Sequence, residues 1–198
     1  MSIVKKVINY PNSKKNSDIS KKTNNRTYSN RGMSLEKDLK ITNQYYLDME
    51  IAAIYKKPTP IQIVKVDYPN RQSAKITEAY YVEPSTTDYN GIYQGKYLDF
   101  EAKETKSKTA FPLNSIHQHQ IEHLKIINKQ KGISFVIIRF SSFSEDYLLI
   151  TEKLLEFIKN NKRKSIPYQW IKKEAALIPM KFNPRIDYLC IIDKIYNI

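Results

Sequence analysis

Apolar residues recur at helical spacing in the segment that follows Ser34. Ser34 can cap the first turn of a helix there, and Glu36 lies where the helix dipole favours an acidic side chain. The positions that share one side of this helix are Leu35, Leu39, Thr42, Tyr46 and Met49. The segment is therefore predicted to be a helix that packs this side on a core.

Three more helices are predicted further along the chain. Ser115, with Gln118 three residues later, is typical of a capping box, and its helix is expected to run to about Gln130. Thr151 is predicted to cap another helix, and residues 186–195 have the spacing of a terminal one.

Segments with the composition of strands lie between the helices. IQIVKV at 61–66 and AKITEAYYV at 74–82 flank a turn-like Tyr-Pro-Asn-Arg at 68–71, which predicts a projecting β-hairpin. ISFVIIRF at 133–140 is apolar almost throughout, as expected for a buried strand, and DYLLI at 146–150 is predicted to be the next strand.

Strict alternation of polar and apolar residues distinguishes the segment YLDFEAKE. A bend at Gly91 and a turn at Gln94 and Gly95 are predicted to lead into it. Because successive side chains of a strand point to opposite faces, the segment should be apolar on one face and polar on the other. The apolar face holds Leu98, Phe100 and Ala102, and the polar face holds Tyr97, Asp99, Glu101 and Lys103.

The order of helix, strands, helix, strands and helices predicts a mixed α/β domain around a central sheet. At 198 residues the chain is long enough for one such core. Residues 1–31 contain few large apolar residues, and their only acidic residue is Asp18, against eight lysines and arginines. We predict a flexible basic arm at residues 1–31 and one domain at residues 32–198.

The charge balance of the chain indicates a polyanionic partner. It has 33 Lys and Arg against 20 Asp and Glu, which gives a formal net charge of +13. Such an excess favours nucleic acid through counterion release, so nucleic acid is the first candidate and an anionic membrane surface the second. The sequence has no strongly amphipathic basic helix with Trp, Phe and Leu on one side, which argues against the membrane.

Three features of the sequence predict a cytoplasmic protein. Cys190 is the single cysteine, so an internal disulfide is excluded. No uninterrupted apolar run approaches the roughly 20 residues needed to span a bilayer. Near the N-terminus, Asn9, Tyr10 and Pro11 interrupt any apolar core of a signal peptide.

The candidate chemistry lies in PSTTDYNGIYQGKYLDFEAKETKSKTAFP. Glu101 and Lys103 are two residues apart and therefore share one strand face. A strand, a turn and a second strand can bring Asp88 back beside Glu101. Two carboxylates that bind Mg²⁺, with one cation, are a minimal set of groups for hydrolysing a phosphodiester. We therefore predict a metal-dependent nuclease site at Asp88, Glu101 and Lys103.

The spacing Asp-x(12)-Glu-x-Lys resembles the PD-(D/E)xK nuclease signature. Longer blocks extend the likeness: YSNRGMSLEKDL, KKPTPIQIV, STTDYNGIYQGKYLDFEAKETKSKTAFPL, HQHQIEHL and PRIDYL together resemble the RecU family of bacterial Holliday junction resolvases. The similarity spans the chain from about Tyr28 to its end and is strongest from Pro84 to Leu124. The arm at residues 1–31 resembles the family only in its basic character and not in its sequence.

This resemblance implies a restriction-endonuclease-like α/β fold, with a central mixed β-sheet flanked by helices and a projecting β-hairpin stalk at about residues 58–82. It implies Mg²⁺ as the cofactor, bound at Thr86, Asp88, Glu101 and Gln120, and it leaves open whether Mn²⁺ can replace it. Lys103 falls where the family places a lysine that stabilises the transition state.

The resemblance also implies partners. It implies a homodimer that cuts two opposed strands of four-way junction DNA during recombination and repair, with the stalk directed toward the junction centre. It further implies that the arm aids junction binding, and that the enzyme acts with a RecA-type recombinase and the branch-migration helicase.

Two other functions are open at this stage. HQIEH, residues 119–123, matches the zinc peptidase pattern H-x-x-E-H, in which His119 and His123 would bind zinc and Glu122 would act as base. No clear downstream acidic zinc ligand accompanies it. The other alternative is a junction-binding protein without catalysis, in which the acidic residues only pair with nearby lysines.

Overall fold

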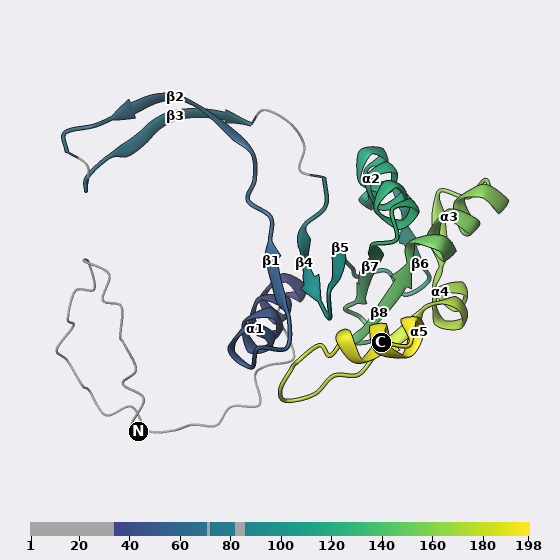
Figure 1. Cartoon of the computed structure of the whole chain (residues 1–198). Coiled ribbons are helices and arrows are strands. Elements are labelled where there is room, and N and C mark those ends of the chain that lie inside the picture. Colours follow the sequence, from purple (N-terminus) through teal and green to yellow (C-terminus); the bar gives the residue numbers. More distant parts are fainter. Residues whose placement is uncertain (1–33, 71, 82–85) are drawn as a thin grey trace, which may run out of the picture. The chain divides into compact units, whose positions relative to one another are not determined.

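The computed structural model describes residues 34–70, 72–81 and 86–198 (Figure 1). The predicted basic arm at residues 1–31 lies outside these ranges. Within them, no helix is both long and apolar enough to cross a membrane.

A six-stranded mixed sheet forms the centre of the domain, in the order β1-β4-β5-β7-β8-β10. Its strands are β1 (Ala53–Lys56), β4 (Tyr89–Tyr93), β5 (Lys96–Thr105), β7 (Ile133–Phe140), β8 (Glu145–Ile150) and β10 (Ala176–Ile178). Strands β5 and β7 are parallel and the other neighbours are antiparallel. The crossover between β5 and β7 contains α2, because parallel strands cannot be joined by a tight turn. The predicted α/β fold with a mixed sheet is confirmed.

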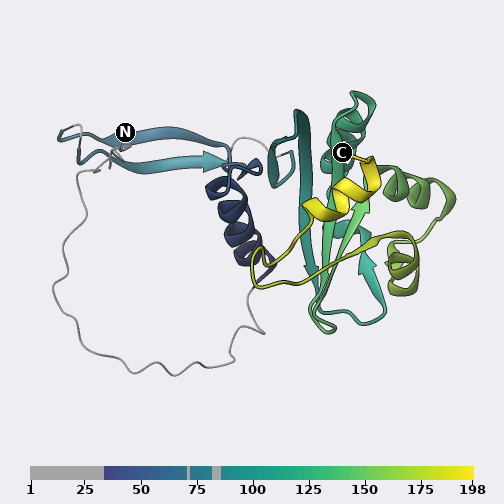
Figure 2. The same ribbon diagram turned by 60° about the horizontal axis from the view of Figure 1, so that its bottom comes forward.

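Helices cover both faces of this sheet (Figure 2). The first face packs against α1 (Leu35–Asp48) and α5 (Leu189–Tyr196). The second packs against α2 (Gln118–Lys129), α3 (Thr151–Asn160) and α4 (Tyr168–Glu174). Alternation along β7 divides its side chains between two cores, which explains why the whole strand is buried.

The helix ends only partly match the prediction. Ser34 caps α1 by accepting from the Lys37 N–H, but Met49, predicted to face the core, is the C-cap residue and is exposed. The predicted capping box at Ser115 is wrong, because residues 113–115 form a 3-10 turn, η2 (Leu113–Ser115). His117 caps α2 instead, with Gln120 as its reciprocal partner.

The last two predicted helices begin later in the chain than expected or lack the expected cap. Thr151 is the first residue of α3 rather than its cap, and its hydroxyl lies 2.7 Å from that of Ser134 on β7. Helix α5 begins at Leu189, because Ile186 forms a bridge with Met180 and its N–H donates to Thr42. Short elements were missed in the sequence: β6 (Ala110–Pro112), β9 (Ser165–Pro167), η2, α4, β1 and β10.

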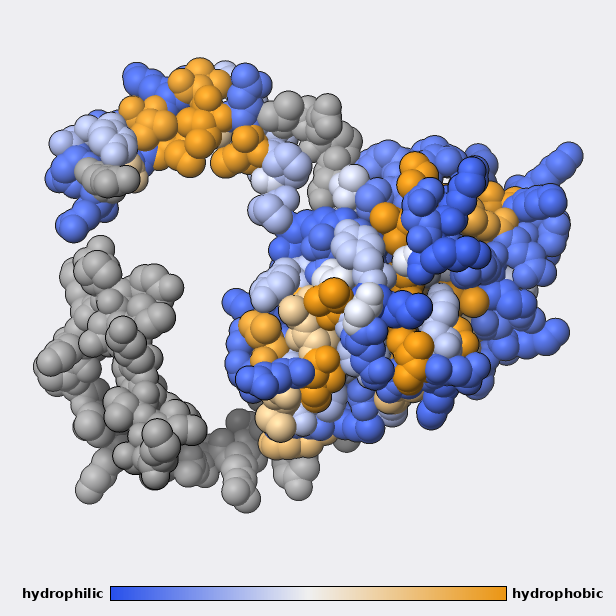
Figure 3. Space-filling model, viewed as in Figure 1, coloured by the Kyte–Doolittle hydropathy of each residue, from blue (hydrophilic) through white to orange (hydrophobic). Residues whose placement is uncertain are grey.

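Two hairpins differ in how much of their surface is covered. The first, β2 (Ile61–Asp67) with β3 (Lys75–Tyr81), is exposed at every residue of both strands. Figure 3 shows apolar side chains gathered on it, among them Ile61, Ile63, Val64, Val66 and Ile76. The predicted hairpin therefore exists, and within the described chain nothing covers its apolar side chains.

The second hairpin, β4 with β5, lies inside the sheet. Its turn at Gln94 and Gly95 is confirmed, and both residues have positive φ. The bend predicted at Gly91 is wrong, since Gly91 pairs within β4. A Cβ there would lie 2.2 Å from the Ala53 carbonyl oxygen, so the glycine allows β1 to approach.

A buried cluster of charges ties the first face of the sheet to α1. Arg139 of β7 donates to Asp146 of β8 at 2.7 and 2.8 Å and to Asp38 of α1 at 2.8 Å. Arg185 donates to the other oxygen of Asp38 at 2.6 Å. Burial opposes the charge of Arg139, but its bonds to Asp146 and Asp38 raise its pKa overall. We call these four residues the arginine cluster.

Candidate active site

Strand β5 presents its polar side chains on the face covered by α2. Leu98 and Phe100 are buried in the core beneath α1 and α5, so Asp99 and Glu101 point to the opposite face. Both carboxyl groups are fully buried. The predicted division of this strand into two faces is confirmed.

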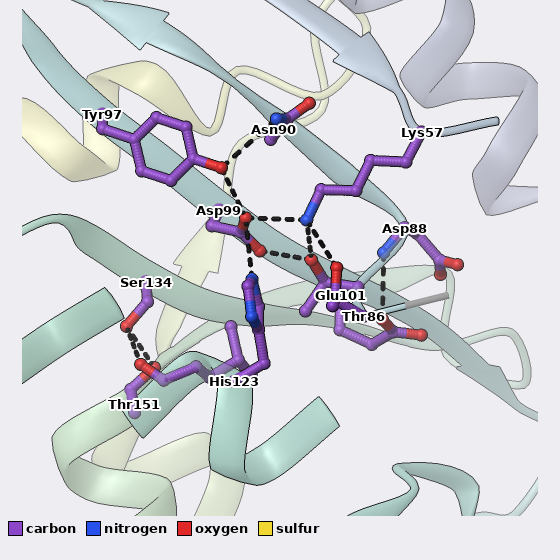
Figure 4. Close-up of polar contacts among 12 residues, drawn as sticks. Lys57, Thr86, Asp88, Asn90, Tyr97, Asp99, Glu101, His123, Ser134 and Thr151 are labelled. Atoms are coloured by element: carbon purple, nitrogen blue, oxygen red, sulfur yellow. Dashed lines mark hydrogen bonds and ion pairs between the residues drawn. The ribbon is translucent and has the colours of Figure 1, made fainter. Parts of the chain in front are cut away.

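The hairpin brings Asp88 to Glu101. Asp88 directly precedes β4, and its backbone N–H donates to Glu101 Oε2 at 3.1 Å (Figure 4). The β4–β5 register sets this contact, because Tyr89 pairs with Phe100 and the next position outward therefore faces Glu101. Residues thirteen positions apart thus meet through local hairpin geometry.

The environment of Glu101 favours its protonated form. Burial raises the pKa of Glu101 to about 7, and the hydrogen bond and charge of Asp88 act in the same direction. Lys103, whose Nζ lies 2.5 Å from Glu101 Oε1, opposes this rise. With a pKa near 7, which already includes the effect of Lys103, Glu101 is only partly ionised at neutral pH.

The donor set fits a hard divalent cation. Glu101 Oε1 is buried and is paired with the Lys103 ammonium group at 2.5 Å, and Asp88 lies next to Glu101. Among the residues that the structure describes, no group of three or more His, Cys, Asp or Glu is placed to hold a metal. Mg²⁺ is usually bound by one or two carboxylates, with water and substrate phosphate as further ligands. Asp88 and Glu101 meet that requirement.

The two neutral ligands predicted by resemblance already have partners. Thr86 Oγ1 accepts from Lys57 Nζ at 3.0 Å. Gln120 is buried, and its Oε1 accepts from the His117 N–H at 2.9 Å as part of the helix cap. A carbonyl oxygen has two lone pairs, so a metal bond is compatible with this cap. Thr86 and Gln120 remain predicted ligands.

Asp99 is the centre of a buried network that the sequence did not predict. The place of Asp99 at the start of the strand predicts a structural or a surface role, and the surface alternative is wrong because Asp99 is fully buried. Thr87 donates to Oδ1, while Oδ2 accepts from Lys57 Nζ at 2.7 Å and Tyr97 OH at 2.9 Å (Figure 4). His123 Nε2 of α2 lies 3.2 Å from the same oxygen.

Glu36 lies near the candidate site without joining it. It lines one pocket with Asp88, Tyr89 and Ala102, but its carboxylate is paired at 2.6 Å with Lys56 on the surface. Its place in the first turn of α1 agrees with the predicted support from the helix dipole.

The HQIEH segment does not form the zinc site of the alternative peptidase function. His123 contacts Asp99, whereas His119 stacks on His117 with ring centroids 5.5 Å apart. Glu122 is exposed and accepts from Gln118 at 3.0 Å. His119, Glu122 and His123 thus have separate partners, and no group of three or more His, Cys, Asp or Glu among the described residues could hold a metal, so these residues do not support a zinc peptidase.

Known proteins resemble this chain over nearly its whole length. The family model RecU, described as recombination protein U, matches residues 30–194. The chain belongs to the RecU family. Two members of the family are called Holliday junction resolvase RecU, one from Oceanobacillus iheyensis and one from Bacillus mycoides. The first is 52% identical over 195 residues, covering 96% of this chain and 100% of the relative. The second is 53% identical over 196 residues, covering 96% and 98%.

A solved structure is also similar to this chain. It is Hjc from Archaeoglobus fulgidus, a Holliday junction resolvase, with a TM-score of 0.40 and 12% sequence identity. The match covers 70% of this chain and 89% of Hjc.

Proposed function

We propose that this chain is a Holliday junction resolvase, a structure-specific endodeoxyribonuclease that introduces symmetric paired nicks in four-way DNA junctions. The observation that carries the proposal is the meeting of Asp88, Glu101 and Lys103 on the polar face of β5. Membership of the RecU family supports the choice of junction DNA as substrate. A DNA substrate of this kind also favours the cytoplasm as the site of action.

Asp88 and Glu101 would hold Mg²⁺, with Thr86 and Gln120 as neutral ligands. When bound, the ion would lower the pKa of the attacking water and neutralise charge on the reacting phosphate and on the leaving 3′ oxygen. Burial of Glu101 keeps bulk water from competing for its oxygens, and the Asp88 N–H holds one of them in place.

Lys103 has two functions in this proposal. Without metal its ammonium group is the counter-charge of Glu101 at 2.5 Å. Its side chain is about one quarter exposed, so it can also reach a phosphate at the mouth of the site. There it would orient the attacking water and stabilise negative charge that develops in the transition state.

Paired nicks require two sites at a fixed separation, which a symmetric homodimer would supply. The exposed β2–β3 hairpin is the proposed stalk, because apolar and aromatic side chains on it are available to a junction centre. The basic arm would add contacts with phosphate. A RecA-type recombinase and a branch-migration helicase are the proposed protein partners, on the family resemblance alone.

The test is cleavage of a labelled synthetic four-way junction beside a linear duplex of equal length, with Mg²⁺, Mn²⁺, Zn²⁺ or chelator. We expect symmetric nicks on the junction with Mg²⁺ and no cleavage with chelator. Tight junction binding without cleavage under any ion would instead indicate a binding protein. Equal cleavage of the duplex would contradict junction specificity.

A further inference from the structure

Lys57 connects three parts of the candidate site. Its Nζ donates to Thr86 Oγ1 at 3.0 Å, Thr87 Oγ1 at 2.6 Å and Asp99 Oδ2 at 2.7 Å (Figure 4). An ammonium group has three N–H donors, so these bonds use all of them. The Lys57 backbone N–H also donates to the Asp88 carbonyl oxygen at 2.8 Å. One residue thus holds the segment from Thr86 to Asp88 through both its main chain and its side chain.

Asp99 determines where the Lys57 ammonium group sits. The Lys57 side chain is 15% exposed and that of Asp99 is fully buried, so little solvent reaches this ion pair, in which Asp99 supplies the negative charge. Asp99 also accepts a hydrogen bond directly from the Thr87 hydroxyl. Thr86 is connected to Asp99 indirectly, because it accepts from the Lys57 ammonium group that Asp99 binds. Its own position is set by β5, which is paired on both sides, with Asn90 of β4 and Ser134 of β7.

Two carboxylates on one face of β5 therefore hold the same short segment at two points. Glu101 accepts from the Asp88 N–H, and Asp99 holds Thr87 and Lys57. We propose that Asp99 is a positioning residue for the metal site, which acts through Lys57 and Thr87 to present the Asp88 carboxylate beside Glu101. This inference rests on the proposed function, because it assumes that Asp88 and Glu101 bind the metal.

The role differs from that of a metal ligand. The two oxygens of Asp99 accept from Thr87, Lys57 and Tyr97, and His123 Nε2 lies 3.2 Å from one of them. Glu101 is contacted by fewer groups, the Asp88 N–H and the Lys103 ammonium group. A carboxylate that accepts hydrogen bonds from a lysine, a threonine and a tyrosine holds those side chains in position rather than binding a metal itself. Groups that support metal ligands in this way typically change metal affinity or activity by about 10-fold to 100-fold when removed.

The test uses Mn²⁺ as a probe of the full-length protein without DNA, with bound and free ion measured by electron paramagnetic resonance. Asp99→Asn keeps the shape of the side chain and removes its charge. We expect its Mn²⁺ dissociation constant to rise by about 10-fold to 100-fold. In junction cleavage the Mg²⁺ concentration for half-maximal rate should rise in parallel, while junction affinity in chelator stays unchanged.

Asp146→Asn is the matched control. Asp146 is also a buried, ion-paired aspartate of the same sheet, but it belongs to the arginine cluster. Its loss should lower stability and leave Mn²⁺ affinity unchanged in the folded protein. Equal weakening of Mn²⁺ binding in Asp146→Asn and Asp99→Asn would overturn the proposal, because the effect would then follow general destabilisation.

A second variant covers failure of Asp99→Asn to fold. Thr87→Val removes only the hydroxyl that donates to Asp99, and Thr87→Ser restores it. We expect Thr87→Val to weaken Mn²⁺ binding and Thr87→Ser to recover it. Wild-type affinity in Thr87→Val overturns the positioning role alone. Absence of Mn²⁺ binding in the wild type would overturn the proposed metal site itself, and the positioning role with it.

Discussion

The arginine cluster and the candidate site place buried charged side chains on opposite faces of the same sheet. The two groups differ in how closely their positive and negative charges match. In the arginine cluster, two aspartates face two arginines, and each oxygen of Asp38 and Asp146 accepts a hydrogen bond. In the candidate site, the buried Asp99 and Glu101 pair with Lys57, Lys103 and His123, and the half-buried Asp88 adds a third carboxyl group whose charge acts against that of Glu101. Within the site, the buried Glu101 has a single lysine, Lys103 at 2.5 Å, against the charge of Asp88 beside it.

The difference separates a structural cluster from a functional one. Burying a charge costs free energy unless partners compensate it, so a balanced cluster can serve stability and specificity. The candidate site leaves part of that cost unmet, which is visible in the raised pKa of Glu101. A divalent cation would supply the missing positive charge. The imbalance therefore supports the proposed metal site on grounds other than family resemblance.

The largest expected effect is on catalysis at Glu101. Glu101→Gln removes the charge that the metal requires, so junction cleavage should fall below detection at any Mg²⁺ concentration. Junction binding in chelator should persist, since Glu101 is buried and faces Asp88 and Lys103. Glu122→Gln, an exposed glutamate of α2, is the control and should cleave normally. Cleavage by Glu101→Gln at the wild-type rate would remove Glu101 from the site.

Lys103 should have the next largest effect. Lys103→Met keeps the length of the side chain and removes the ammonium group, which should lower the cleavage rate at saturating Mg²⁺ by about 100-fold to 1,000-fold. Lys125→Met, on the exposed side of α2, provides the comparison. If Lys103→Met changes only the Mg²⁺ requirement and not the maximal rate, Lys103 serves Glu101 rather than the transition state.

The arginine cluster should respond in stability instead. Arg139→Met leaves Asp38 and Asp146 buried with one remaining arginine, and should lower the free energy of unfolding by about 3–5 kcal/mol. Urea unfolding measures this change, and Arg163→Met on the surface is the control. If Arg139→Met leaves the free energy of unfolding unchanged, the charge-balanced arginine cluster does not stabilise the fold.

The smallest effect concerns pH in the metal-free protein. The folded-state pKa of Glu101, about 7, is above its ordinary value of 4.5, so its contribution to stability is complete below about pH 4.5 and is lost as pH rises through 7. Glu101→Gln cannot ionise and should escape this loss. In chelator at pH 8 the variant should be more stable than wild type by about 1–3 kcal/mol.

Unfolding in urea between pH 5 and pH 8 measures that difference. Added Mg²⁺ should stabilise the wild type and not the variant, because only the wild type has the charged ligand. If the difference in the free energy of unfolding between the two proteins does not change with pH, the raised pKa of Glu101 is contradicted.

Local patterns were enough for much of the fold and part of the candidate site. Alternation along β5 predicted which face carries Asp99, Glu101 and Lys103, because the period of a strand is two whatever surrounds it. The turn at Gln94 and Gly95 predicted the hairpin that returns Asp88 to Glu101. The apolar run at 133–140 predicted a strand buried on both faces.

Long-range contacts decided the rest. Lys57 is 42 positions and His123 is 24 positions from Asp99, and neither has a sequence signal for that contact. Ser115 and His117 both have side chains that can cap a helix, and the 3-10 turn at residues 113–115 determined which one does. Strand β1 was missed because only its pairing with β4, at a glycine, makes it part of the sheet.

The sequence alone thus determined the elements with a strong period, the nuclease signature and the resemblance to the RecU family. Only the tertiary structure decided which charges are buried and which partners they have. The physical reason is that periodicity and turn chemistry act over a few residues, whereas the cost of burying a charge depends on every group that the fold brings around it. Asp99 and Glu101 are two residues apart on one strand face, and the fold surrounds Asp99 with Thr87, Lys57 and Tyr97 while it places Glu101 beside Asp88 and Lys103.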